Sequence, residues 1–118
     1  MSVLVLTDDL IFSTKIEAVA RQLGAVICLV ANPNQLNQAL CEKTFRLAII
    51  DLNSSNDTAL DSVRSIHEQL PHLPVLGFCS HVQGELQKQA LAAGCLQVVP
   101  RSVFVQQLPD LLMGKPAA

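Results

Sequence analysis

Five short apolar runs recur along the chain, and each one ends in polar or turn-forming residues. Little polar alternation interrupts them, which is typical of strands that are covered on both faces. The runs are Val3–Leu6, Ala25–Ala31, Leu47–Ile50, Pro74–Cys79 and Leu96–Val99. They predict the five strands of a buried parallel sheet.

The segments between these runs carry apolar residues at three- and four-residue spacing, which indicates amphipathic helices. The first predicted helix covers about 10–23 and ends at Gly24, because glycine readily adopts the backbone conformation that terminates a helix. The second helix follows Asn32, whose side chain can cap it. Pro71 closes the third helix, and Gly94 stops the fourth.

The last predicted helix carries more apolar residues than one buried stripe requires. They are Val103, Phe104, Val105, Leu108, Leu111 and Leu112. Ser102 can cap this helix, and Pro109 removes one backbone donor from its interior, so we expect a kinked or shortened helix. We interpret Val103, Phe104, Leu108 and Leu111 as candidates for an exposed interaction surface. The alternative is that a leucine-rich last helix simply closes the core.

Five strands that alternate with five helices predict a doubly wound, flavodoxin-like α/β fold with a parallel sheet. We expect right-handed crossovers, the strand order 2-1-3-4-5 and helices in two layers. A chain of 118 residues is long enough to bury the core of one such domain. The domain is expected to cover residues 1–114, and residues 115–118 to form a flexible tail.

Two of the predicted strands end in acidic residues. Asp8 follows the first strand and Asp51 follows the third, and the predicted order makes these strands neighbours. Their carboxylates would repel each other unless a divalent cation, a shared proton or a neighbouring positive charge lay between them. Oxygen ligands would favour Mg²⁺. The alternative interpretation is that each acid only opens a loop, since Asp is common in turns.

Composition narrows the classes of partner. The chain has 8 Lys and Arg residues and 10 Asp and Glu residues, so it lacks the basic surface that binds nucleic acid or an anionic membrane. No apolar run approaches the roughly 20 residues that span a bilayer, and the first residues do not resemble a secretory signal. We therefore expect a cytoplasmic protein whose four cysteines are buried, reduced thiols.

This order of strands, helices and strand-end residues resembles the receiver domain of two-component response regulators over essentially the whole chain. The resemblance implies a signalling module and not an enzyme. It makes Asp51 the candidate phosphoacceptor and places Asp8, Asp51 and Asn53 at a candidate Mg²⁺ site. It also makes Ser80 and Arg101 the hydroxyl and the cation that would contact a phosphoryl group.

The sequence departs from the family's pattern at the acids that hold the metal. The family has a pair of acidic residues after the first strand, and Thr7 takes the place of one of them. Asp9 would replace the lost acid only if the loop shifted by one residue. This departure affects metal binding.

Other departures affect the switch. Arg101 stands where the family has Lys, and its planar guanidinium is not equivalent to a Lys ammonium group. Val98 stands where the family has an aromatic residue that moves on phosphorylation. An alignment without gaps would put Cys79 instead of Ser80 at the hydroxyl position.

The leading hypothesis is a receiver-like signalling module that acts through protein–protein interaction, with weak or absent phosphorylation of Asp51. The expected partner is a protein, such as a histidine kinase or an output protein. A homodimer through the face of the fourth and fifth helices is a further expectation. His81, after the fourth strand, is a candidate for modulating Asp51 by its charge.

Two alternatives stay open. In the first, the chain is a working phosphoreceiver, in which Mg²⁺ held by Asp8, Asp51 and the Asn53 carbonyl assists phosphoryl transfer from a histidine kinase to Asp51. In the second, it is a small flavodoxin-like enzyme such as an FMN protein. That enzyme would need a phosphate-binding loop after the first strand, where residues 7–9 are instead anionic.

Overall fold

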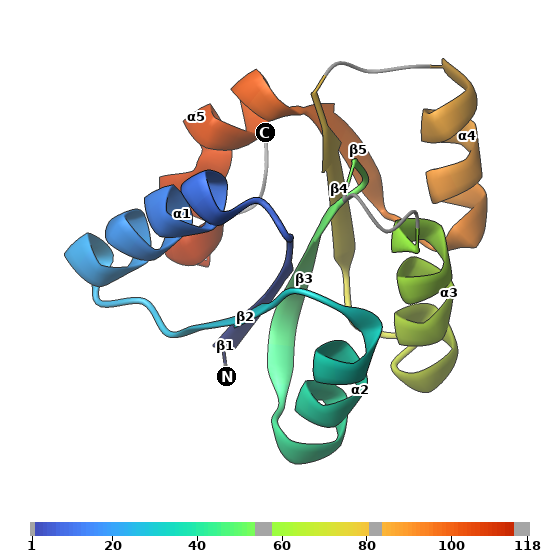
Figure 1. The fold of residues 1–118 in the computed structure, drawn as a ribbon, viewed down its shortest axis with the longest axis horizontal. Coiled ribbons are helices and arrows are strands. Elements are labelled where there is room, and N and C mark those ends of the chain that lie inside the picture. Colours follow the sequence, from blue (N-terminus) through green and yellow to red (C-terminus); the bar gives the residue numbers. More distant parts are fainter. Residues whose placement is uncertain (1, 54–57, 81–83, 115–118) are drawn as a thin grey trace.

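The sheet has five parallel strands in the order β2-β1-β3-β4-β5, which confirms the predicted fold (Figure 1). The structure is a computed structural model that describes residues 2–53, 58–80 and 84–114 of the chain. The strands are β1 (Ser2–Leu6), β2 (Ile27–Val30), β3 (Phe45–Asp51), β4 (Val75–Cys79) and β5 (Gln97–Pro100). Because β1 pairs directly with β3, the residues that follow these two strands meet at one edge of the sheet.

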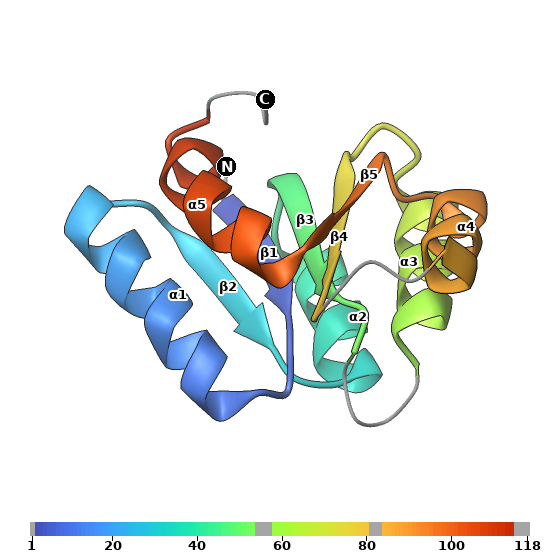
Figure 2. The ribbon, with the colours of Figure 1, turned by 90° about the horizontal axis from the view of Figure 1, so that it is seen from above.

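Helices cover both faces of the sheet, with α1 and α5 on one face and α2, α3 and α4 on the other (Figures 1 and 2). They are α1 (Leu10–Leu23), α2 (Pro33–Glu42), α3 (Ala59–Gln69), α4 (Gly84–Ala93) and α5 (Arg101–Leu112). Successive side chains of a strand point to opposite faces. Val3 and Val5 therefore pack against α1 and α5, whereas Leu4 and Leu6 pack against the other helix layer.

Two helix ends follow the signals in the sequence. Asn32 caps α2, and its side-chain oxygen accepts a hydrogen bond from the Gln35 N–H at 2.9 Å. Gly24 ends α1 in the left-handed conformation, with φ of 67°. These local interactions explain why the predicted ends of both helices agree with the structure.

The start of α5 differs from the prediction. The helix begins at Arg101 instead of after Ser102, and Pro100 occupies the cap position with no side-chain cap. Pro is well suited to this position because its restricted φ favours the turn from a strand into a helix. The helix then runs through Pro109 to Leu112, so the proline does not end it.

The apolar residues of α5 mostly belong to the core, which corrects the expected interaction surface. Phe104, Leu108 and Leu111 are 0%, 2% and 5% exposed, and Val103 is partly buried against the same cluster. Together with α1 they cover one whole face of the sheet, so this stripe closes the core. The exposed large apolar side chains of this part of the chain are others, namely Leu91 of α4, Leu96 just before β5 and Val105 of α5.

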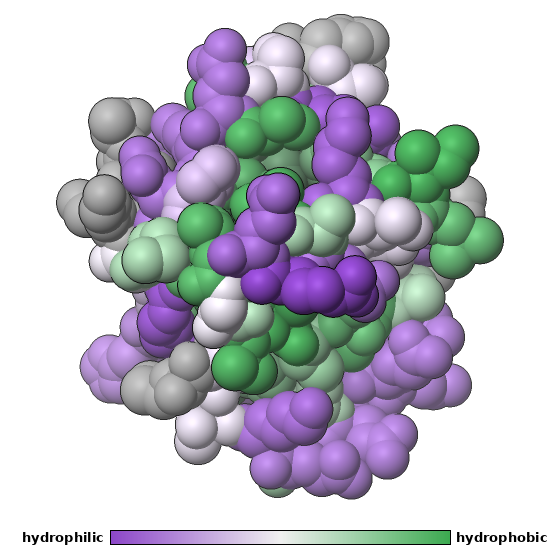
Figure 3. Space-filling model, turned by 90° about the vertical axis from the view of Figure 1, so that its left-hand side faces the viewer, coloured by the Kyte–Doolittle hydropathy of each residue, from purple (hydrophilic) through white to green (hydrophobic). Residues whose placement is uncertain are grey.

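The side of the molecule formed by α1 and the edge strand β2 shows hydrophobic patches that hydrophilic side chains interrupt (Figure 3). The exposed apolar residues of α1 and of the segment before β2 are Leu10, Ile11, Leu23 and Val26. No described helix is both long enough and apolar enough to cross a membrane. Residues 115–118, the expected tail, lie outside the described residues.

The cysteines are less uniform than the sequence suggested. Cys79 and Cys95 are buried as predicted, but Cys28 is only partly buried and Cys41 is exposed. All four are free thiols. Burial raises the pKa of the Cys95 thiol to about 11, because an apolar environment disfavours the thiolate.

Iodoacetamide at pH 8 is expected to alkylate Cys41 first and to leave Cys95 unmodified while the protein is folded. Burial shields Cys95 from the reagent, and with a pKa of about 11 only about one thiol in a thousand is ionised at this pH. Peptide mapping by mass spectrometry over a time course measures both rates. Equal rates in the native protein would contradict the burial of Cys95, whereas in urea all four cysteines should react.

Substitution of Gly94 by Ala is expected to lower the free energy of unfolding by about 1–3 kcal/mol. Gly94 has φ of 132°, and a Cβ there would lie 2.8 Å from Cβ of His67. Gly84→Ala is the matched control, because nothing lies within 4 Å of its added Cβ. Urea denaturation of both variants measures the difference. An equal effect of the two substitutions would show that Gly94 is not constrained in this way.

Candidate functional site

The site lies at the carboxyl ends of β1, β3 and β4, where open α/β sheets place their ligands. Asp51 is the last residue of β3, and its side chain is almost completely buried, with 2% exposure. The pairing of Leu6 with Ile50 brings the residue after β1, Thr7, beside Asp51. A buried carboxylate needs hydrogen bonds and a positive charge close by, since an unpaired one is costly.

Neighbouring residues donate hydrogen bonds to both carboxylate oxygens of Asp51. The Thr7 hydroxyl donates to Oδ2 at 2.8 Å, and the Asn53 N–H donates to Oδ1 at 2.9 Å. The Asn53 side-chain oxygen in turn accepts a hydrogen bond from the Ser80 N–H at 2.6 Å. These bonds connect the ends of β1, β3 and β4 around one carboxylate.

Arg101, the first residue of α5, supplies positive charge to this edge. Its Nη2 atom lies 3.8 Å from Oδ2 of Asp51, and its Nη1 atom lies 3.6 Å from Oδ2 of Asp9. The guanidinium also lies over the ring of Phe12, with Cζ 4.6 Å from the ring centroid, and it is 5.9 Å from the centroid of Phe78. A guanidinium on an aromatic face is stabilised by the ring quadrupole.

The Arg101 contacts are electrostatic rather than directional. Both ion-pair distances exceed the range of a good hydrogen bond, and Nε of Arg101 is buried without a hydrogen-bond partner. The phenyl rings beneath it form a group of three, in which Phe78 and Phe104 stack with centroids 4.5 Å apart. This cluster holds the guanidinium next to the acids and joins it to α1, β4 and α5.

Asp9 has two roles at the edge of the site. Its Oδ1 atom accepts a hydrogen bond from the Phe12 N–H at 3.0 Å and so caps α1. Its Oδ2 atom faces Arg101, and its own N–H donates to the Thr7 hydroxyl oxygen at 3.2 Å. Asp9 therefore joins the start of α1 to the same network as Asp51.

The structure places the remaining candidates as follows. Asn53, Ser80 and Arg101 join Asp51 at one edge, as the sequence analysis expected, and Ser80 is exposed whereas Cys79 is buried within β4. Asp8 is partly buried in the connection from β1 to α1. Val98 is buried in β5. His81 lies outside the described residues.

The donor set at this edge does not suit a divalent cation. Thr7 offers a neutral hydroxyl where the family pattern has an acid, and that hydroxyl is already bonded to Asp51. A cation beside Asp51 would also meet the guanidinium of Arg101, a like charge. Among residues 2–53, 58–80 and 84–114, no three His, Cys, Asp or Glu side chains are grouped to hold a metal ion. Arg101 is the residue that forms an ion pair with Asp51.

Sequence reasoning missed three parts of this site. It treated Thr7 as a lost acid and not as a donor to Asp51, and it did not assign Asp9 as the cap of α1. The cap had a local signal, because Asp9 directly precedes the apolar pattern of α1. The stacking of Arg101 on Phe12 had none, since these residues are distant in sequence and meet only when α1 and α5 pack together.

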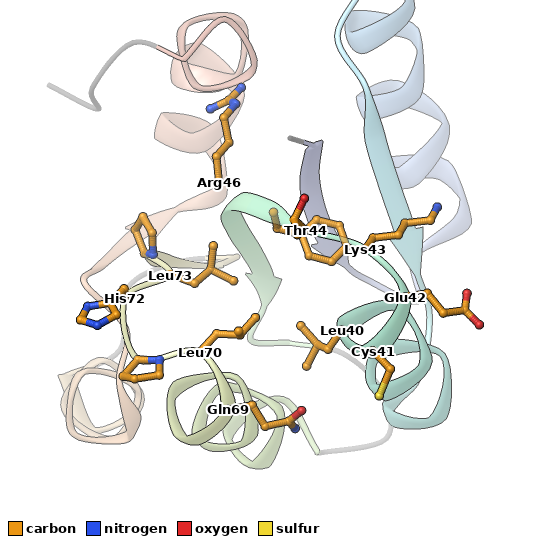
Figure 4. A pocket seen from close by; sticks show the side chains of 13 residues that line it. Leu40, Cys41, Glu42, Lys43, Thr44, Arg46, Gln69, Leu70, His72 and Leu73 are labelled. Atoms are coloured by element: carbon orange, nitrogen blue, oxygen red, sulfur yellow. The ribbon is translucent and has the colours of Figure 1, made fainter.

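A pocket of about 780 Å³ lies at the amino ends of β3 and β4, on the side of the sheet away from Asp51. It is lined by the end of α2, the start of β3 and the loop before β4. Leu40, Leu70 and Leu73 point into it, whereas Arg46 points away toward the last helix (Figure 4). The pocket is separate from the acidic site because the two lie at opposite ends of β3.

Comparisons with known proteins identify the family of this chain. The response regulator receiver domain family matches residues 3–112, and the chain belongs to this family. Among curated proteins, the chain is 26% identical over 108 residues to the transcriptional regulatory protein ZraR of Klebsiella oxytoca. That match covers 92% of this chain and 24% of ZraR, so the chain spans about a quarter of this relative. Receiver domains are signalling modules of two-component systems.

Solved structures of response regulators share the fold. One from Burkholderia pseudomallei, with a phosphorylated aspartic acid, a calcium ion and citrate, has a TM-score of 0.82 at 17% identity. The match covers 94% of this chain and 65% of that one. A two-component response regulator from Clostridium difficile has a TM-score of 0.82 at 12% identity, and the match covers 97% and 96% of the two chains. At these identities the likeness shows the fold alone.

Replacement of Thr7 by Val is expected to lower the free energy of unfolding by about 1.5–3 kcal/mol, the usual contribution of a hydrogen bond to a charged group. Valine keeps the shape of threonine but leaves the buried Asp51 oxygen without its 2.8 Å donor. Thr14→Val, on the exposed side of α1, is the matched control and should change stability by less than about 0.5 kcal/mol. Urea denaturation measures both, and equal effects would refute the role of Thr7.

Proposed function

We propose that this receiver domain signals through protein–protein interaction, with a positive charge of the chain itself in place of Mg²⁺ and phosphate. The observation that carries the proposal is the position of Arg101, which faces Asp51 and Asp9 over the ring of Phe12. The Asp51 carboxylate is balanced by this guanidinium without a metal. Phosphorylation of Asp51 is therefore weak or absent.

The hydrogen bonds of Asp51 support this proposal. Phosphoryl transfer needs a strongly nucleophilic carboxylate oxygen and cations that neutralise the developing charge. Oδ2 accepts from Thr7 and faces Arg101, and Oδ1 accepts from the Asn53 N–H, so these contacts lower the nucleophilicity of both oxygens. A guanidinium brings charge, but it cannot coordinate oxygens from both reactants as Mg²⁺ does.

One observation favours the second candidate, a working phosphoreceiver. Asn53, which follows β3, and Ser80, which follows β4, lie near Asp51, and Ser80 is exposed and able to contact an incoming group. In that function Mg²⁺, the cofactor that the family implies, would bring the positive charge, and a histidine kinase would donate the phosphoryl group. Asp8 would then have to serve as the acid of the metal site.

The partner in the leading proposal is a protein. Receiver domains interact with histidine kinases and with output domains. We propose a homodimer contact through α4, β5 and α5, where Leu91 of α4, Leu96 just before β5 and Val105 of α5 are 44%, 76% and 38% exposed. These three side chains replace the buried residues of α5 as the candidates for that contact.

Incubation with acetyl phosphate and Mg²⁺ is expected to leave the chain without phosphate, because Arg101 and Thr7 occupy the surroundings of Asp51. Intact-mass spectrometry before and after acid or base treatment measures the modification. A receiver with a complete acid pair and Lys, assayed in the same tube, shows that the donor is active. Stoichiometric acid-labile phosphate on this chain, lost in Asp51→Asn, would refute the proposal and support the phosphoreceiver.

The double variant Thr7→Asp, Arg101→Lys tests whether Thr7 and Arg101 are the reason that Asp51 does not accept phosphate. It restores the acid and the smaller cation of the family pattern, so it should gain Mg²⁺-dependent phosphorylation that the parent chain lacks. A Mg²⁺ titration followed by the amide resonances of Asp8, Asp51 and Asn53 is an independent check. Large saturable shifts in the parent chain would contradict the conclusion that its donor set does not suit the metal.

A further inference from the structure

The strand β3 contacts α5 at both ends of the helix. Asp51 closes β3 and faces Arg101, the first residue of α5. Arg46, the second residue of β3, donates from Nη2 to the carbonyl oxygens of Leu111 and Leu112 at 3.0 and 2.7 Å. The strand thus carries a charged residue at each of its ends, and each of these residues contacts a different end of α5.

The contact of Arg46 meets a need of the helix end. The last carbonyls of a helix have no partner within it, and a positive charge near them is favourable. The last turn of α5 contains no basic residue, so Arg46 brings this charge from another element. Figure 4 shows its side chain running from the start of β3 toward α5. The bonds are charge-assisted, and the shorter one is typical of strong bonds of this kind.

Pro109 makes the last turn of α5 depend more on Arg46. A proline has no N–H, so the helix lacks the hydrogen bond that residue 109 would donate to the carbonyl of Val105. Beyond it, the Met113 N–H donates to the Pro109 carbonyl and the Gly114 N–H donates to the Leu111 carbonyl. The final turn is therefore less strongly joined to the rest of the helix than an uninterrupted one.

The middle of α5 is well suited to transmit a displacement. Phe104 and Leu108 are fully packed against Val5, Ile49 and other residues of the sheet and α1. Packed interiors deform little, so a shift at one end of such an element moves the other end. A helix of this length spans about 18 Å at 1.5 Å per residue.

We infer that Arg46 is a positioning residue for the end of α5, and that it couples this end to the Asp51–Arg101 pair. The inference rests on the proposed function in taking that pair as the signalling element. With Arg46 in place, a rearrangement of the ion pair between Asp51 and Arg101 at the start of α5 displaces the last turn of the helix. Without Arg46, the last turn is already loose and no longer responds.

The test is a double-mutant cycle with Arg46→Gln and Arg101→Gln, measured by native-state amide hydrogen exchange in the full chain. Arg46→Gln should reduce protection of the Met113 and Gly114 amides about tenfold, as expected for loss of charge-assisted bonds. Arg101→Gln should reduce it about threefold when Arg46 is present and should have no further effect in Arg46→Gln. Urea denaturation of each variant separates these local changes from global unfolding.

Two controls sharpen the cycle. Arg46→Lys keeps a donor and should restore part of the protection, whereas Arg21→Gln, at the exposed end of α1, should not change the last turn. Additive effects of the two substitutions, or no effect of Arg101→Gln on Met113 and Gly114, would overturn the inference. Phosphorylation of Asp51 is measured separately, so phosphate on Asp51 together with a coupled cycle would refute only the proposed function.

Discussion

The buried carboxylate of Asp51 is the constraint on which the rest of the site depends. A charge that is 2% exposed at the end of a central strand must be paired or strongly hydrogen bonded, or it would destabilise the fold. The chain meets this need with Thr7, the Asn53 N–H and Arg101, which come from three different parts of the sheet edge. Each of these contacts also positions a neighbouring segment of the chain. The contacts that stabilise the Asp51 carboxylate therefore define the arrangement of this edge of the sheet.

The same strand connects this edge to the last turn of α5. β3 carries Asp51 at one end and Arg46 at the other, and each faces an end of α5. The scaffold of a receiver domain is therefore retained, with its parallel sheet and two helix layers. At the end of β3, the guanidinium of Arg101 faces Asp51 and lies over the ring of Phe12.

The fold could be predicted because its signals are local and repeated. Apolar runs, three- and four-residue spacing, Asn32 and Gly24 each act within a few residues of where they stand, and together they specify the order of elements. The rules for parallel sheets then brought Asp8 and Asp51 to one edge, and the resemblance to receiver domains added Asn53, Ser80 and Arg101. The predictions of burial were wrong for apolar residues that could lie either in the core or on the surface. Phe104, Leu108 and Leu111 face the core, and Cys41 faces solvent, because packing between distant elements decides burial.

The sequence by itself determined the class of fold, the strand order and the meeting of the residues that follow β1 and β3, because periodicity and chain connectivity leave few other arrangements. Only the tertiary structure decided which of these residues balance one another. Arg101 meets Phe12 and Asp9 because α1 and α5 pack side by side, and Arg46 meets the carbonyls of Leu111 and Leu112 across 65 and 66 residues of chain. Contacts of this kind depend on distances of a few ångströms between elements, which no local pattern specifies.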